Sequence, residues 1–173
     1  MVKKIKYEVI RKIDNFEIRK YPEFLLASVE NYDDNKAFGF LFDYISGKNK
    51  IQEKIEMTAP VISSKKIEMT SPVLSNKNYF AFVMPSNYTK DNIPLPLNPK
   101  VKIKVQPQKQ LAVTKFGGYA SDKKVKKFGL QLLMKLKLNN IKTKGEPILM
   151  RYNSPFAPPF FRRNEIGVEI KND

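Results

Sequence analysis

The stretch Asp33-Asp-Asn-Lys-Ala-Phe-Gly-Phe-Leu-Phe-Asp-Tyr-Ile-Ser-Gly47 predicts a helix between two groups of strand-like segments. An aspartate at its start can cap the helix, apolar residues follow at helical spacing, and a glycine ends it. Aromatic side chains cover more than one stripe of this helix. The pattern fits either a helix packed on a sheet or a helix whose second aromatic face looks into a ligand pocket.

The segments before this helix predict antiparallel strands. Tyr7–Ile13 and Phe16–Tyr21 flank Asp14-Asn15, a pair that tolerates the positive φ of a tight turn, and together they indicate a hairpin. Phe24–Glu30 follows as a further strand. The chain therefore starts with three strands and then turns into a helix.

The segments after the helix contain an internal repeat. Lys54-Ile-Glu-Met-Thr-Ala-Pro-Val61 recurs as Lys66-Ile-Glu-Met-Thr-Ser-Pro-Val73, and only Ala59 and Ser71 differ between the copies. Apolar and polar residues alternate in each copy until a proline removes a ladder donor, which predicts two short strands. Tyr79–Met84 is predicted as the next strand, and a proline-rich connection follows.

The second half of the chain repeats the order of the first. Its predicted elements are two strands, a helix beginning after Ser121 and two closing strands, at 101–105, 110–116, 122–138, 147–152 and 164–170. We therefore expect a single α+β domain over residues 1–173, in which similar halves at about 5–92 and 100–171 share one core.

Cysteine and histidine are both absent from the sequence. Disulfides, thiolate or histidine metal sites, cysteine nucleophiles and the Ser-His-Asp triad are therefore excluded. The start of the chain does not have the pattern of a secretory signal, and no apolar run is long enough to span a membrane, so a cytoplasmic location is expected.

Positive charge is concentrated in one region of this basic protein. The formal net charge is +15, and the stretch from Asn98 to Gly145 holds 13 lysines against one acid, Asp122. This region is either a solvated lysine surface that keeps the protein soluble or an interaction module for nucleic acid or an anionic membrane surface.

The loop Ser154-Pro-Phe-Ala-Pro-Pro-Phe-Phe-Arg-Arg163 combines aromatic, rigid and cationic residues. It either tucks its phenylalanines onto the core or forms the wall of a pocket for a flat apolar ligand, with an arginine meeting a carboxylate of that ligand.

Several segments together give the chain a resemblance to the SOUL heme-binding protein family. The resemblance runs in order from about residue 5 to 170. It is carried by the segments Tyr7–Val9, Glu17–Pro22, Phe38–Gly47 with Asn49, the two Ile-Glu-Met-Thr-x-Pro-Val copies, Phe82–Pro85, Tyr152–Pro155 and Arg163–Glu165. The combination is specific, although each piece alone is weak.

The resemblance implies both a fold and a ligand. The fold is a duplicated strand–helix–strand arrangement that forms a distorted antiparallel β-barrel flanked by two helices, similar to the ligand-binding domains of some bacterial transcription regulators. The ligand class is heme or another porphyrin, held in an apolar groove beside the first helix. Some members place a histidine on the iron, which this sequence excludes.

A tetrapyrrole needs apolar walls and a cation for its propionates. The residues that we expect to supply them are Phe38, Leu41, Phe42, Phe156, Phe160, Phe161, Arg162 and Arg163. Axial ligation would fall to Tyr, Met or Lys, but Met57 and Met69 sit inside strand motifs and fit core packing better.

We expect binding without catalysis. No nucleophile–base pair stands out in the sequence, and Glu56 or Glu68 alone in a repeated strand motif is weak support for acid/base chemistry. The expected partner is a small-molecule tetrapyrrole or another apolar anionic small molecule, and nothing in the sequence indicates an oligomeric state.

Overall fold

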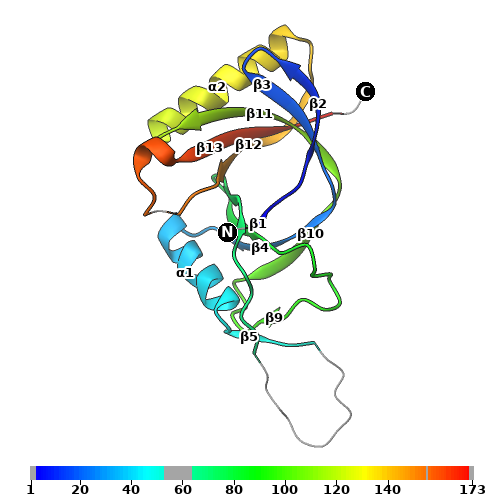
Figure 1. Cartoon of the computed structure of the whole chain (residues 1–173), viewed down its shortest axis with the longest axis vertical. Helices are drawn as coiled ribbons and strands as arrows, with labels where there is room; N and C mark the ends of the chain where they lie inside the picture. The colour runs from blue at the N-terminus through cyan, green and yellow to red at the C-terminus, as the bar shows by residue number, and fades with distance from the viewer. Residues whose placement is uncertain (1–2, 53–63, 155, 172–173) are drawn as a thin grey trace, which may run out of the picture. The chain divides into compact units, whose positions relative to one another are not determined.

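The computed structural model describes residues 3–52, 64–154 and 156–171, and they form two interleaved compact units. Unit 1 comprises residues 1–5, 24–71 and 77–106, and unit 2 comprises residues 6–23, 72–76 and 107–173. Each unit contains one of the two long helices, which Figure 1 shows as α1 and α2. None of the helices in the described part of the chain is long and apolar enough to cross a membrane.

Unit 1 combines helix α1 with short ladders of strands. Its elements are β1 (Lys3–Lys4), β4 (Phe24–Glu30), α1 (Asp34–Ile45), β5 (Asn49–Lys50), β6 (Thr70–Ser71), β8 (Tyr79–Val83), β9 (Leu95–Pro96) and β10 (Lys102–Gln106). The strand β4 lies between β10 and β8 and pairs antiparallel with both, while β5 pairs with β9 and β1 runs parallel to β6. Helix α1 contacts β4 and β8.

Unit 2 is a larger antiparallel sheet covered by helix α2. Its elements are β2 (Glu8–Ile13), β3 (Phe16–Tyr21), β7 (Val73–Ser75), β11 (Lys109–Gly117), α2 (Asp122–Leu138), β12 (Thr143–Arg151), the 3₁₀ turn η1 (Pro159–Phe161) and β13 (Arg163–Ile170). The order across this sheet is β7-β12-β13-β11-β3-β2, and every neighbouring pair is antiparallel. The strands β2, β3 and β11 are strongly curled in Figure 1.

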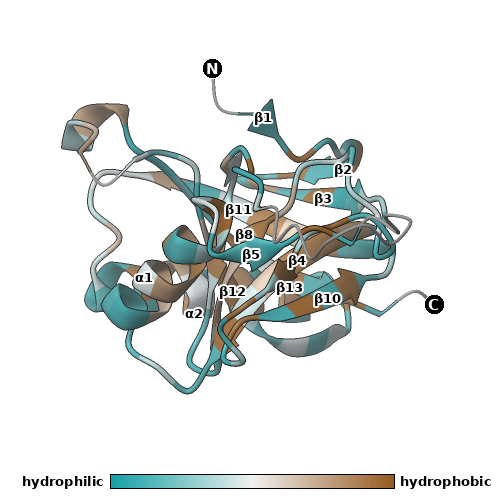
Figure 2. Cartoon of the chain, turned by 90° about the horizontal axis from the view of Figure 1, so that it is seen from below, coloured by the Kyte–Doolittle hydropathy of each residue, from teal (hydrophilic) through white to brown (hydrophobic). Residues whose placement is uncertain are grey.

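The core of unit 2 lies between α2 and its sheet. Leu132 and Leu136 point inward from α2 and are at most 1% exposed, and they pack with Phe16, Ile166 and neighbouring apolar residues of the sheet. Figure 2 shows that α1 of unit 1 carries both the hydrophilic and the hydrophobic colour. This is the pattern of a helix that buries one face on a sheet.

The predicted fold class is confirmed: antiparallel strands form a distorted barrel-like sheet, and two helices accompany them. The tight turn of the first hairpin is also as predicted, because Asp14 has a φ of 48°. Asp33 caps α1 by accepting a hydrogen bond from the Lys36 amide at 3.0 Å. Gly47, with a φ of 121°, follows the end of α1.

The compact units differ from the two expected halves of the sequence. The first hairpin groups with the C-terminal half because β3 pairs along β11, with Phe16 opposite Thr114 and Ile18 opposite Ala112. The second repeat copy is less regular than predicted, since only Thr70–Ser71 and then Val73–Ser75 form strands around Pro72. The first copy lies outside the described residues.

Candidate functional site

Helix α1 places two phenylalanines together on the surface of unit 1. The rings of Phe38 and Phe42 stack with their centroids 5.8 Å apart, and Phe42 is 50% exposed. Phe38 also meets Phe82 of β8 edge-on at 5.5 Å, so it connects the exposed ring to the core. We call Phe38 and Phe42 the α1 aromatic surface.

The third residue expected on this helix has a different position. Leu41 is fully buried in unit 1, so it supports the helix from inside and offers no surface to a ligand. The assignment of Leu41 as a ligand contact is therefore corrected by its burial. Helical spacing alone placed all three side chains near one another, but it did not define which side of α1 faces the sheet.

A second aromatic pair joins Phe40 of α1 to Tyr32, which precedes the helix, and the sequence did not indicate this contact. Phe40 meets Tyr32 edge-on at 5.3 Å, and the Lys100 ammonium lies 4.9 Å from the Phe40 centroid and 5.0 Å from the Tyr32 centroid. A cation over two ring faces is electrostatically favourable. Because Lys100 is far from both rings in sequence, spacing gives no signal for this cluster.

The Phe/Pro/Arg loop of unit 2 leaves its phenylalanines uncovered. Phe156, Phe160 and Phe161 are 94%, 79% and 69% exposed, and the last two rings lie 4.5 Å apart. The first alternative for this loop, in which its phenylalanines pack onto the core, is therefore wrong, because all three rings are exposed. Exposed apolar area of this kind marks an interaction or ligand surface.

Arg162 brings a positive charge to the same loop. Its Nε donates to the Ala157 carbonyl at 2.7 Å, which braces the loop, and its guanidinium lies 4.5 Å from the centroid of the exposed Tyr119 ring. We call Tyr119, Phe156, Phe160, Phe161 and Arg162 the aromatic loop surface. It combines the flat apolar area and the cation that a porphyrin with carboxylates requires.

Arg163, by contrast, belongs to an internal ion-pair network. It donates to Glu165 Oε1 at 2.6 and 3.0 Å and to the Tyr7 hydroxyl at 3.3 Å, and its guanidinium lies over the Tyr152 ring at 4.6 Å. Its Nε and Nη2 donors are thus engaged by Glu165 and Tyr7, so Arg163 is not part of the aromatic loop surface.

The centre of this network is a fully buried ion pair. Arg19 on β3 and Glu165 on β13 are both 0% exposed, and two guanidinium nitrogens donate to the carboxylate at 2.8 and 3.1 Å. Arg19 also donates to Glu17 at 2.8 Å, and its guanidinium lies 4.2 Å from the Tyr7 ring centroid. Bidentate contacts of this kind are strong inside a protein.

The network fixes the ionisation of its members. Burial by itself would raise the pKa of Glu165, but the hydrogen bonds and charges of Arg19 and Arg163 outweigh it and hold that pKa below its ordinary value. Burial raises the pKa of Tyr21, whose hydroxyl accepts from Arg19, to about 12. A carboxylate held ionised between two arginines is a poor general base.

The structure describes two of the other four candidates for chemistry, Glu68 and Met69. Glu68 forms a surface ion pair with Lys3 at 2.7 Å, Met69 is half-buried, and Glu56 and Met57 lie outside the described residues. Over the part of the chain that the structure describes, no group of three or more acidic, histidine or cysteine side chains could hold a metal ion.

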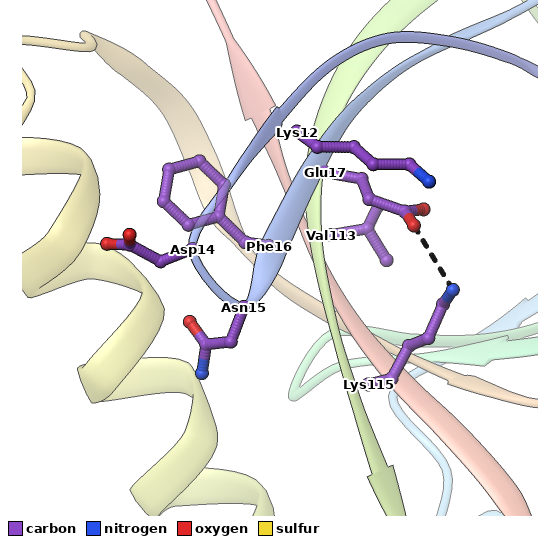
Figure 3. A pocket seen from close by; sticks show the side chains of 7 residues that line it. All are labelled: Lys12, Asp14, Asn15, Phe16, Glu17, Val113 and Lys115. Carbon is purple, nitrogen blue, oxygen red and sulfur yellow. Dashed lines mark hydrogen bonds and ion pairs between the residues drawn. The ribbon is translucent and has the colours of Figure 1, made fainter.

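One hollow near the first hairpin is too small for a tetrapyrrole. It has a volume of about 200 Å³ and is lined by Lys12, Asp14, Asn15, Phe16, Glu17, Val113 and Lys115. Figure 3 shows the Lys115 ammonium directed at the Glu17 carboxylate, and the two groups are 3.3 Å apart. Small-molecule sites commonly occupy about 300–1,000 Å³, so this hollow is not the candidate site.

Comparison with known proteins gives a family and a fold. The model of the SOUL heme-binding protein family matches residues 2–169. A crystal structure of a hydrolase from Listeria innocua is similar at 12% identity, with a TM-score of 0.57 over 94% of each chain. The EcmrR C-terminal domain is similar at 11% identity, with a TM-score of 0.58 over 96% of this chain and 99% of that one. These two likenesses concern the fold alone, and no curated protein sequence matches the chain.

Proposed function

Because the chain belongs to the SOUL heme-binding protein family, we propose that it binds heme or a related tetrapyrrole, without histidine ligation and without catalysis. The observation that supports this most directly is the aromatic loop surface, where three phenylalanines are at least 69% exposed beside Arg162. The α1 aromatic surface supports it independently in unit 1.

The physics of a flat apolar ligand agrees with such surfaces. Covering one exposed phenylalanine ring removes tens of Å² from water, which at about 25 cal/mol per Å² contributes on the order of 1 kcal/mol per ring. Several rings and one carboxylate–guanidinium contact then offset the entropy lost on association. We infer that binding depends on apolar contact and on Arg162 rather than on the iron.

A role without catalysis is consistent with the state of the buried carboxylate. Glu165 is ion-paired with Arg19 and Arg163, and its lowered pKa keeps it ionised and engaged rather than available to accept a substrate proton. The Listeria innocua structure described as a hydrolase resembles this chain in fold only, and activity does not follow from fold.

Two variants test which surface holds the ligand. Phe160→Ser/Phe161→Ser alters unit 2 and Phe42→Ser alters unit 1, and each removes exposed rings without disturbing the core. We expect at least one of them to raise the Kd for metal-free protoporphyrin about tenfold, because the bound ligand then covers less apolar surface. The measurement is a titration in which porphyrin absorbance and tyrosine fluorescence report the amount of bound ligand.

The matched control is Leu97→Ser, because Leu97 is 59% exposed and lies on neither surface. Its Kd should equal that of the wild type. Arg162→Gln should weaken the binding of the free porphyrin acid. It should leave the binding of the porphyrin dimethyl ester unchanged, since the ester carries no carboxylate. If the Kd is the same in both aromatic variants and the wild type, these surfaces are not the binding site.

A further inference from the structure

Helix α2 presents an apolar row to solvent on the side opposite its buried face. Leu130, Met134 and Leu138 follow one another at four-residue spacing and are 52%, 65% and 80% exposed. Residues four apart lie one above the other on a helix, so these three side chains form a continuous row. Such a row does not contribute to the core of unit 2, which Leu132 and Leu136 fill from the other side.

Lysines surround this apolar row. Those on α2 with exposed side chains are Lys123, Lys126, Lys127 and Lys137, and Asp122 is the single acidic residue of the helix. Long exposed apolar side chains flanked by lysines are typical of helices that lie flat in the interface of a membrane. We call this side of α2, with its apolar row and these four lysines, the outer face of α2.

A basic hollow adjoins the outer face at the C-terminal half of α2. It has a volume of about 620 Å³ and is lined by Leu133, Lys137, Asn140, Ile141, Lys142, Thr143 and Lys171. Three of these residues are lysines and none is acidic. The backbone of Lys171 donates to the Lys142 carbonyl at 2.9 Å, which holds the two chain segments together at its rim. We call it the lysine hollow.

The hollow and the apolar row are next to each other on the helix. Leu133 and Lys137 are three residues beyond Leu130 and Met134 respectively, and i,i+3 neighbours share a helix surface. An anionic group seated in the lysine hollow would therefore lie beside side chains suited to hydrocarbon.

From this juxtaposition we propose that the outer face of α2 and the lysine hollow dock unit 2 on the surface of a bilayer that contains anionic phospholipid. Lysines attract the negative headgroups, the hollow receives a headgroup phosphate, and Leu130, Met134 and Leu138 enter the interface between headgroups and acyl chains. The docking goes beyond tetrapyrrole binding and does not depend on it.

The apolar row favours lipid over the other occupants of a basic surface. Nucleic acid would use the lysines but would leave the exposed leucines and the methionine without a role, because its backbone offers phosphates rather than hydrocarbon. A second copy of the chain would bring its own lysines of the same sign to this face, and like charges in close contact oppose association.

The experiment is vesicle co-sedimentation of the full chain with phosphatidylcholine vesicles, with and without phosphatidylserine. The wild type is expected to bind only the vesicles with phosphatidylserine, and less as salt is added. The variant Leu130→Ser/Met134→Ser/Leu138→Ser should partition at least about tenfold less, since three apolar side chains no longer enter the interface. The charge variant Lys137→Gln/Lys142→Gln/Lys171→Gln should lose about fivefold per lysine.

Two control variants show whether vesicle binding depends on where the lysines and apolar side chains lie, or only on how many are removed. The variant Lys66→Gln/Lys77→Gln/Lys90→Gln removes the same charge from exposed lysines of unit 1 and should lose less binding than the hollow variant. The variant Leu95→Ser/Leu97→Ser removes exposed apolar residues of unit 1 and should bind as the wild type does. All variants should keep the wild-type circular dichroism and porphyrin affinity, so failure of docking and failure of tetrapyrrole binding are read separately.

The proposal is overturned if the apolar-row variant binds phosphatidylserine vesicles as well as the wild type does. It is also overturned if duplex DNA binds more tightly than the vesicles and the apolar-row variant retains that DNA binding. A wild-type dimer in sedimentation equilibrium that the apolar-row variant abolishes would assign the face to a second copy instead.

Discussion

Glu165→Gln is expected to lower the free energy of unfolding by about 3–5 kcal/mol, because it leaves the buried Arg19 guanidinium without its principal counterion. Both side chains are 0% exposed and are joined by two hydrogen bonds. Water cannot replace the missing charge at this position. Urea unfolding, followed by circular dichroism, gives the free energy.

The remaining contacts of Arg19 set the upper limit of this effect. Glu17 still accepts from Arg19 at 2.8 Å in the variant, so part of the charge stays compensated. The double variant Arg19→Met/Glu165→Leu should be less destabilised than the sum of the single variants Arg19→Met and Glu165→Leu, since it leaves neither charge buried and alone.

The dependence of the free energy of unfolding on pH, below about pH 5, provides a second test of the Glu165 ion pair. The pKa of Glu165 is lowered in the folded protein relative to its ordinary value of 4.5, so its contribution is present above about pH 4.5 and is lost as the pH falls through the folded-state pKa. The free energy of unfolding of the wild type should therefore decrease as the pH is lowered from 4.5. In the Glu165→Gln variant it should depend less on pH in this range.

An exposed ion pair is the control for this prediction. Asp43 and Lys48 are 2.8 Å apart, with side chains 49% and 70% exposed, and Asp43→Asn should cost less than about 1 kcal/mol. If Glu165→Gln and Asp43→Asn destabilise the protein equally, the buried network does not have the role that its burial indicates.

Phe16→Ala is expected to destabilise the protein by about 3–5 kcal/mol, the cost of removing a large ring from a packed core. Phe16 is 1% exposed and packs in the cluster between α2 and the unit 2 sheet, although it belongs to the first hairpin of the chain. The loss would show that this hairpin is part of the same cooperative core as residues 107–173. Thermal and urea unfolding both measure it.

The matched control is the same substitution at an exposed ring. Phe160 is 79% exposed, so Phe160→Ala should change the free energy of unfolding by less than about 0.5 kcal/mol. A loss below about 1 kcal/mol for Phe16→Ala would contradict the packing of the hairpin against α2.

The local features of this fold were predictable from the sequence. The pair Asp14-Asn15 marks a turn that requires a positive φ, and Asp33 and Gly47 bound a helix by capping and by left-handed geometry. The helix predicted after Ser121, at 122–138, is α2 as the structure has it, Asp122–Leu138. Each of these signals lies within a few residues, where steric and hydrogen-bonding rules act directly.

The contacts between distant segments were not predictable in the same way. Arg19 and Glu165 are 146 residues apart, and neither a charge pattern nor a spacing links them. The pairing of β3 with β11, which moves the first hairpin out of the expected N-terminal half, likewise depends on which strands complete one sheet. Which strands pair depends on how the apolar faces of all the segments pack together, so no single segment predicts the pairing.

The site residues show the same division. The sequence indicated aromatic side chains on α1 and in the loop, but burial separates Leu41 from Phe42, and the ion-pair network separates Arg163 from Arg162. Neighbouring residues of similar type thus have different roles. Composition alone does not distinguish a ring that covers the core from a ring that faces solvent.

The most direct test of histidine-free tetrapyrrole binding is a parallel titration of the wild-type protein with ferric heme and metal-free protoporphyrin. Absorbance and tyrosine fluorescence report the bound ligand. We expect saturable one-to-one binding of both, with dissociation constants within about tenfold of each other, because apolar contact rather than iron ligation supplies the affinity. No saturable change with either ligand at micromolar concentration, or saturation by heme alone, would contradict the account.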